Sequence, residues 1–255
     1  MITRRHFGAL AGGALASIAL GGACHSQGET QQPDDGRLAA RPRSNITTSA
    51  DGESKLGLAL ERDAILRMPA RSTGSPIPLL VLLHGAGGSA EGVLGRLGSA
   101  PDEAGVAVLA PVSRDSSWDA IRSSFGPDVT FLNRALERVF DTVSVDPERI
   151  AIGGFSDGAT YALALGLING DLFSRVVAFS PGFVIEGTPN GRPFFFISHG
   201  EADPILPIDR CSRRIVADLR KRGYDVTFRE FPGGHTIPSD IARDALRWVA
   251  GTVPQ

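Results

Sequence analysis

Residues 150–160, IAIGGFSDGAT, decide the fold, because Gly-x-Ser-x-Gly stands here between a strand-like run and a helix-like run. A serine on so sharp a strand-to-helix turn has strained backbone angles. Glycines two positions on either side let the strand and the helix approach closely. The start of the following helix favours negative charge. The stretch therefore predicts that the Ser156 hydroxyl projects from the carboxyl end of a strand.

Composition and charge limit the class of protein. The chain has 255 residues, of which 42% are hydrophobic and 21% charged, and its net charge is −2. This is ordinary globular composition, and residues 51–255 suffice for one domain with a buried core. No basic block follows the leader, so nucleic acid is not expected as a partner. The only cysteines, Cys24 and Cys211, cannot form a disulfide framework.

The first 24 residues are predicted to be a targeting segment. Arg4 and Arg5 precede an apolar, small-residue stretch over 9–23, and this pattern resembles a twin-arginine export signal. The stretch is short for a membrane span. It ends at Cys24, in a context that resembles a lipoprotein cleavage site, so either lipidation of Cys24 or release after Ala23 is consistent with it. The segment predicts export, to the periplasm, the cell envelope as a lipoprotein, or the medium. The only membrane attachment expected is a lipid at Cys24.

Residues 25–50 are expected to be a flexible tether. They are dominated by Gln, Pro, Asp, Gly, Arg, Ser and Thr and have little apolar content.

Beyond the tether, strand-like and helix-like patterns alternate. Two short strands over 56–60 and 63–68 are expected to form a hairpin. Buried strands are predicted over 76–83, 106–110, 149–154, 175–180, 193–198 and 225–231, and helices over 89–98, 128–142, 209–222 and 239–250, with a further helix after Ser156. This alternation predicts an α/β fold, with a mostly parallel central sheet flanked by helices. Loops at the carboxyl ends of such strands share one edge of the sheet.

A serine nucleophile needs a base and an acid that orients the base. The chain has five histidines, of which three, His84, His199 and His235, lie beyond the leader and tether. His235 follows the last predicted strand, and Asp203 follows the strand before it. Glu201 is the rival acid, although a solvated loop charge is the simpler interpretation.

The order Ser156, Asp203, His235 is that of the α/β-hydrolases. The chain resembles this superfamily over residues 79–248, and within it the phospholipase/carboxylesterase-like and polyhydroxybutyrate-depolymerase-like esterases. The motifs that carry the resemblance are HGAGG at 84–88, GFSDG at 154–158, HGEAD at 199–203 and GGH at 233–235.

The resemblance implies a role for each residue. Ser156 would attack the acyl carbonyl, His235 would move the proton, and Asp203 would orient the imidazole. The Asp157 N–H would be one oxyanion donor, and the Ala86 N–H, or that of neighbouring Gly87, the other.

Three further residues are placed near this site. His84 is expected to border the substrate cleft and to shape the oxyanion loop, and His199 to brace the acid loop. Trp118 either forms a wall of the substrate pocket, as in the resembled esterases, or only packs its own loop. The spacing of His84 and His199 does not suit a metal, and no metal or other cofactor is expected.

The resemblance implies an exported hydrolase that cleaves small or polymeric carboxylic esters through an acyl-enzyme. Polyester or feruloyl esters, thioesters and peptides remain open as substrates. A non-catalytic envelope binding module has no need of all three triad residues. The short segment over 181–192 leaves no room for a large cap domain, so an open cleft is expected. The pattern does not predict an oligomeric state.

Overall fold

The computed structural model describes residues 35–70 and 76–252. The predicted signal over 1–24, with Cys24, and the tether over 25–34 lie outside these ranges. The elements follow one another as β1 (Glu53–Lys55), β2 (Ala64–Arg67), β3 (Ile77–Leu83), α1 (Ala90–Leu97), α2 (Ala100–Ala104), β4 (Ala107–Pro111), α3 (Asp119–Arg122), α4 (Pro127–Thr142), β5 (Val145–Phe155), α5 (Asp157–Ile168), β6 (Arg175–Phe179), β7 (Phe194–Gly200), α6 (Ser212–Lys221), β8 (Val226–Phe231) and α7 (Ser239–Val249).

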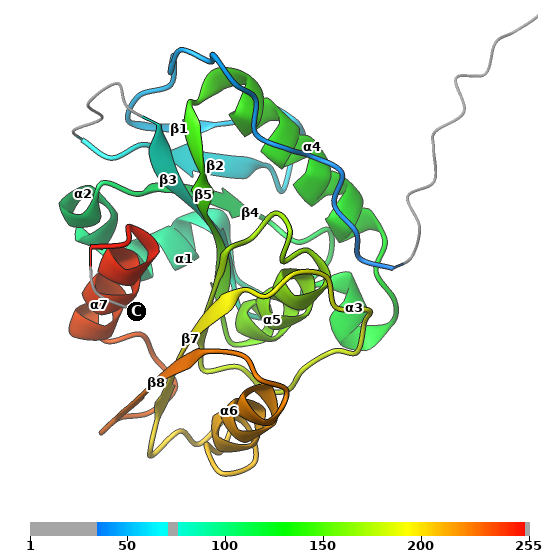
Figure 1. Cartoon of the computed structure of the whole chain (residues 1–255), viewed down its shortest axis with the longest axis vertical. Coiled ribbons are helices and arrows are strands. Elements are labelled where there is room, and N and C mark those ends of the chain that lie inside the picture. Colours follow the sequence, from blue (N-terminus) through cyan, green and yellow to red (C-terminus); the bar gives the residue numbers. More distant parts are fainter. Residues whose placement is uncertain (1–34, 71–75, 253–255) are drawn as a thin grey trace, which may run out of the picture. The chain divides into compact units, whose positions relative to one another are not determined.

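The strands of the described residues form one eight-stranded sheet in the order β1-β2-β4-β3-β5-β6-β7-β8. Strands β3 to β8 pair in parallel, whereas β1 and β2 join the sheet antiparallel. The predicted mostly parallel sheet is confirmed. Because parallel strands need crossover connections, helices cover both faces of the sheet (Figure 1).

The apolar run of β3 explains how both faces are buried. Successive side chains of a strand point to opposite faces. Leu79, Val81 and Leu83 accordingly lie in one core with residues of α4, α5 and α6, whereas Leu80 and Leu82 lie in a second core with residues of α1 and α7. Every residue of β3 is buried, so the strand has no polar face.

The first strand of the amino-terminal hairpin lies earlier in the sequence than predicted. This strand is Glu53–Lys55 rather than 56–60, and it pairs antiparallel with β2. The Asp63 carboxylate explains the shift, because it accepts hydrogen bonds from the N–H groups of Gly57 and Leu58. Gly57 has a φ of 68°. These bonds turn the chain where a strand was expected.

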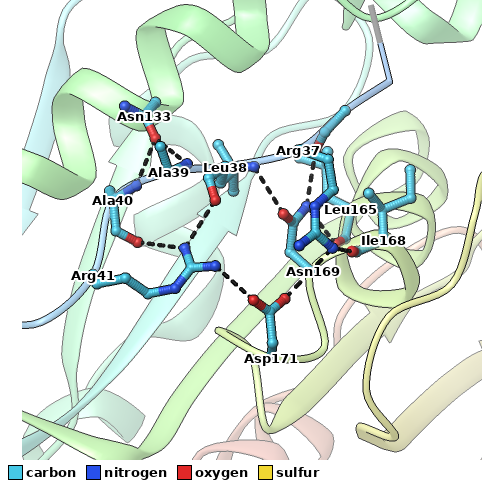
Figure 2. Close-up of polar contacts among 11 residues, drawn as sticks. Arg37, Leu38, Ala39, Ala40, Arg41, Asn133, Leu165, Ile168, Asn169 and Asp171 are labelled. Carbon is cyan, nitrogen blue, oxygen red and sulfur yellow. Dashed lines mark hydrogen bonds and ion pairs between the residues drawn. The ribbon is translucent and has the colours of Figure 1, made fainter. Parts of the chain in front are cut away.

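The prediction of a flexible tether does not hold for Arg37–Arg41, which packs on the domain (Figure 2). Alternate side chains of this segment point inward, so that Leu38 is 2% and Ala40 4% exposed. The Asn133 carbonyl accepts from the N–H groups of Ala39 and Ala40, both at 2.8 Å. The compact unit therefore includes residues on the amino-terminal side of position 51.

A second asparagine holds the same segment at the end of α5. Asn169 is fully buried. Its side chain accepts from Leu38 N–H at 2.8 Å and donates to the Gly36 and Leu165 carbonyls at 2.9 and 3.0 Å. Arg41 pairs with Asp171 at 2.6 Å just beyond (Figure 2). Helix α5 begins directly after Ser156, so this packing fixes the far end of the helix that carries the elbow.

We expect Asn169→Ala to lower the free energy of unfolding by about 2–4 kcal/mol, because it leaves buried backbone groups without partners. Urea unfolding measures the change. Asn190→Ala is the matched control, since no side-chain hydrogen bond of Asn190 occurs among the described residues, and it should cost less than about 0.5 kcal/mol. Equal losses for the two variants would contradict the packed state of Arg37–Arg41.

No helix in the described part of the chain is both long enough and apolar enough to cross a membrane.

Candidate active site

The turn between β5 and α5 has the strained geometry that its sequence predicts. Ser156 has a φ of 57° and a ψ of −120°, which is unfavourable for a residue with a side chain. A Cβ on Gly154 would lie 2.4 Å from the Gly158 carbonyl, and one on Gly158 would lie 2.2 Å from the Leu83 oxygen. Both glycines are thus required by close backbone approach, and the Ser156 side chain lies on the cleft that this turn borders.

His235 and Asp203 come together beside this cleft. The His235 Nδ1 lies 2.6 Å from the Asp203 Oδ2. A carboxylate only accepts, so Nδ1–H is the donor and Nε2 is left to face another group. His235 lines the same cleft as Ser156, and its ring packs on Phe155 with 4.7 Å between ring centroids. The structure thus brings together the three residues predicted as a triad.

The Asp203 carboxylate is held in its ionised form. Burial opposes ionisation, but the Leu206 N–H, the His235 ring and the Ile205 N–H all donate to it, and together they keep its pKa below the ordinary value. A buried carboxylate with several donors stays charged and can stabilise an imidazolium beside it.

His199 braces the acid loop, as the sequence predicts, and has no exposed surface. Its Nε2 lies 2.7 Å from the Leu206 carbonyl and 3.2 Å from the Asp203 Oδ2, so Nε2 carries the proton. The Nδ1 then accepts from the Ser212 hydroxyl at 2.7 Å. Burial lowers the pKa of His199, which fits a neutral ring that orients Asp203.

The acid loop and the histidine loop are joined through their backbones. Glu201 N–H donates to the Phe231 carbonyl, and Ala202 N–H donates to the Gly233 carbonyl. A Cβ on Gly200 would lie 2.4 Å from the Gly233 oxygen, so only glycine permits this approach. The Glu201 side chain is exposed, and the acid that contacts His235 is Asp203, not its rival.

The loop after β3 leaves one predicted oxyanion donor available and engages the other. Gly87 N–H donates to the Ser116 carbonyl at 2.6 Å, which argues against Gly87 as a donor. Neither the Ala86 N–H nor the Asp157 N–H donates to another group among residues 35–70 and 76–252. Ala86 lines the cleft beside Ser156, and Asp157 begins α5, where the helix dipole favours negative charge.

His84 borders the cleft, but both ring nitrogens are engaged. Its Nε2 accepts from Ser113 N–H at 3.0 Å, so the protonated Nδ1 donates to the Gly85 carbonyl at 2.7 Å. Burial is the main reason why the pKa of His84 is lowered. The ring is therefore neutral and shapes the oxyanion loop, and it has no free nitrogen with which to bind substrate.

The expectation that Trp118 forms a wall of the substrate pocket is not met. Trp118 is only 2% exposed and does not line the cleft of Ser156. Its Nε1–H donates to the His84 carbonyl at 2.8 Å, and its ring stacks on Tyr161 with 5.4 Å between centroids. The alternative prediction, that Trp118 packs its own loop, describes what the structure contains.

Sequence reasoning missed two features around the elbow. The Ser117 hydroxyl donates to the Asp157 Oδ2 at 2.6 Å, which ties the loop after β4 to the start of α5. The cleft has a volume of about 270 Å³, and Arg96, Val93 and Ile205 also line it. Arg96 lies in the helix predicted over 89–98, just after the oxyanion loop, and this position is the signal from which its place at the cleft could have been predicted.

The connection from β6 to β7 forms no cap. Over residues 181–190 the described chain has no helix or strand, and Ile205, on the acid loop, stays 65% exposed at the cleft. The described residues also contain no group of three or more His, Cys, Asp or Glu side chains that could hold a metal.

The sheet topology and the serine elbow define the chain as an α/β-hydrolase. Within that superfamily, residues 128–252 of the chain match the family described as Phospholipase/Carboxylesterase.

Named relatives agree with this class. The chain is 31% identical over 188 residues to a candidate esterase, NocK, of Nocardia uniformis subsp. tsuyamanensis, covering 68% of this chain and 53% of that protein. It is 29% identical to acyl-protein thioesterase 1 of Gibberella zeae, over 44% of this chain and 51% of that protein. The chain thus spans about half the length of these two relatives.

The crystal structure of esterase PE8 has the same fold, with a TM-score of 0.59 and 21% identity, over 74% of this chain and 97% of that one.

Proposed function

We propose that the protein is a serine hydrolase that cleaves carboxylic esters through an acyl-enzyme. The observation that carries this proposal is the 2.6 Å hydrogen bond from His235 to Asp203 at the cleft that Ser156 lines. A binding module would need neither the strained serine nor an ionised acid behind the histidine. The match to an esterase family supports the same class of reaction.

Each group has one task in the proposed mechanism. His235 Nε2 takes the proton of Ser156 as its oxygen attacks the acyl carbonyl, and Asp203 stabilises the imidazolium that forms. The N–H groups of Ala86 and Asp157 receive the developing oxyanion, and one such donor typically contributes about 3 kcal/mol to the transition state. His235 then protonates the leaving alcohol, and water releases the acid by the same steps.

Thioesters are the second candidate substrates, because a thiol leaves from the same tetrahedral intermediate and a relative is named acyl-protein thioesterase 1. Ethyl butyrate and S-ethyl thiobutyrate form a matched pair that differs only in the leaving atom. The ratio of their kcat/KM values decides which class the cleft favours.

Burst kinetics with p-nitrophenyl acetate test the proposal. We expect one equivalent of p-nitrophenol to appear before the steady state, and a fluorophosphonate to modify Ser156 covalently, as found by peptide mass spectrometry. Absence of turnover for all esters and thioesters, with Ser156 unmodified, would instead favour a binding module.

A further inference from the structure

The cleft around Ser156 contains one cation that the proposed mechanism does not use. Arg96, in the last turn of α1, lines the cleft together with Ser156 and His235. Among the described residues that line this cleft, Arg96 alone carries a fixed charge. The nearby Asp203 carboxylate lies behind His235 and already accepts four hydrogen-bond or ion-pair contacts.

The Arg96 guanidinium is held close to the reacting groups. Its Cζ lies 4.4 Å from the centroid of the Phe155 ring, and Phe155 lies 4.7 Å from the His235 ring centroid. The distance from the Arg96 Cζ to the centre of the His235 ring therefore cannot exceed the sum of these two distances. Phe155 directly precedes Ser156 in the chain, so the same ring positions the cation and supports the proposed base.

The contact with Phe155 leaves the guanidinium able to bind a ligand. Stacking on a ring uses the flat face of a guanidinium, whereas its N–H donors lie in the plane and point outward. The ion pairs of the described residues do not include Arg96, whose side chain is exposed. A planar fork of donors suits a carboxylate, which it can bind through both oxygens.

We propose that Arg96 selects substrates that carry a carboxylate beyond the scissile ester. The inference rests on the proposed hydrolase function and names a substrate class for it. A cleft of about 270 Å³ suits a short substrate, whose carboxylate would meet Arg96 while Ser156 meets the carbonyl. The carboxylate could belong to the acyl part or to the alcohol part of the ester.

Two matched pairs of esters separate these sources. Monomethyl adipate and methyl hexanoate differ in charge on the acyl side, and 4-acetoxybutanoate and butyl acetate differ on the alcohol side. Acid release in a pH-stat gives kcat/KM for each ester. We expect the wild type to have the higher kcat/KM for the anionic member of one pair. Arg96→Gln should reduce that preference about fivefold, mainly through KM, because an ion pair at an exposed side chain contributes little binding energy.

Further variants separate charge from packing. Arg96→Lys keeps the charge and should retain most of the preference, and added salt should weaken it in the wild type. Arg134→Gln is the matched control, since Arg134 is an exposed arginine on α4 that does not line the cleft, and it should leave the preference unchanged. Equal preferences in the wild type and Arg96→Gln would overturn the inference.

Binding to Ser156→Ala keeps the two proposals distinguishable. In this background calorimetry gives the Kd of each ester without turnover, and adding Arg96→Gln should weaken binding of the anionic member about fivefold relative to the neutral one. If the wild type turns over no ester, the proposed function fails, and the Kd ratio alone decides whether Arg96 binds carboxylates. An unchanged Kd ratio overturns the role of Arg96 even where neutral esters are hydrolysed.

Discussion

Ser156→Ala is expected to lower kcat for p-nitrophenyl acetate by a factor on the order of 10⁶, because it removes the hydroxyl that forms the acyl-enzyme in the proposed mechanism. The burst should vanish with it. The variant keeps the backbone N–H groups of Ala86 and Asp157, so a residual rate above that in water is consistent with the proposal.

Folding must be separated from chemistry in this variant. Alanine at position 156 retains a Cβ at a φ of 57°, so the backbone strain is the same and the free energy of unfolding should change little. Ser124→Ala, a serine on the exposed surface, is the control and should hydrolyse the ester at the wild-type rate. A Ser156→Ala protein that is folded and still turns over within tenfold of the wild type would exclude Ser156 as the nucleophile.

The sequence predicts the elbow well because its determinants are local. Gly154 and Gly158 are required by contacts within a few residues of Ser156 and with the neighbouring strand, and the pattern Gly-x-Ser-x-Gly records that requirement. The partners Asp203 and His235 could be predicted because the loops after parallel strands share one edge of the sheet.

Features that depend on distant partners could not be predicted in this way. Arg37–Arg41 lies within residues 25–50, whose overall composition is typical of a linker, but its backbone is bound by Asn133 and Asn169, which are far along the chain. Likewise the choice between Ala86 and Gly87 depends on the Ser116 carbonyl, which engages Gly87 N–H. Neither contact leaves a trace in local composition or spacing.

Asp203→Asn should lower kcat by about 10⁴-fold, equivalent to about 5.5 kcal/mol of transition-state stabilisation. In the wild type the His235 Nδ1–H donates to Asp203 Oδ2, which leaves Nε2 able to take the proton of Ser156. An asparagine can turn its amide N–H toward Nδ1, which then accepts, and the proton moves to Nε2. The imidazole would present the wrong nitrogen to the nucleophile, and no anion would stabilise its charged form.

Glu201→Gln tests the rival acid on the same loop. Glu201 is exposed, and loss of its charge should change kcat less than about twofold, since a solvated charge interacts weakly with the site. Both variants are assayed with p-nitrophenyl acetate, and urea unfolding establishes that each is folded. A large loss in Glu201→Gln, with Asp203→Asn still active, would transfer the orienting role to Glu201 and contradict the hydrogen bond on which the proposed triad rests.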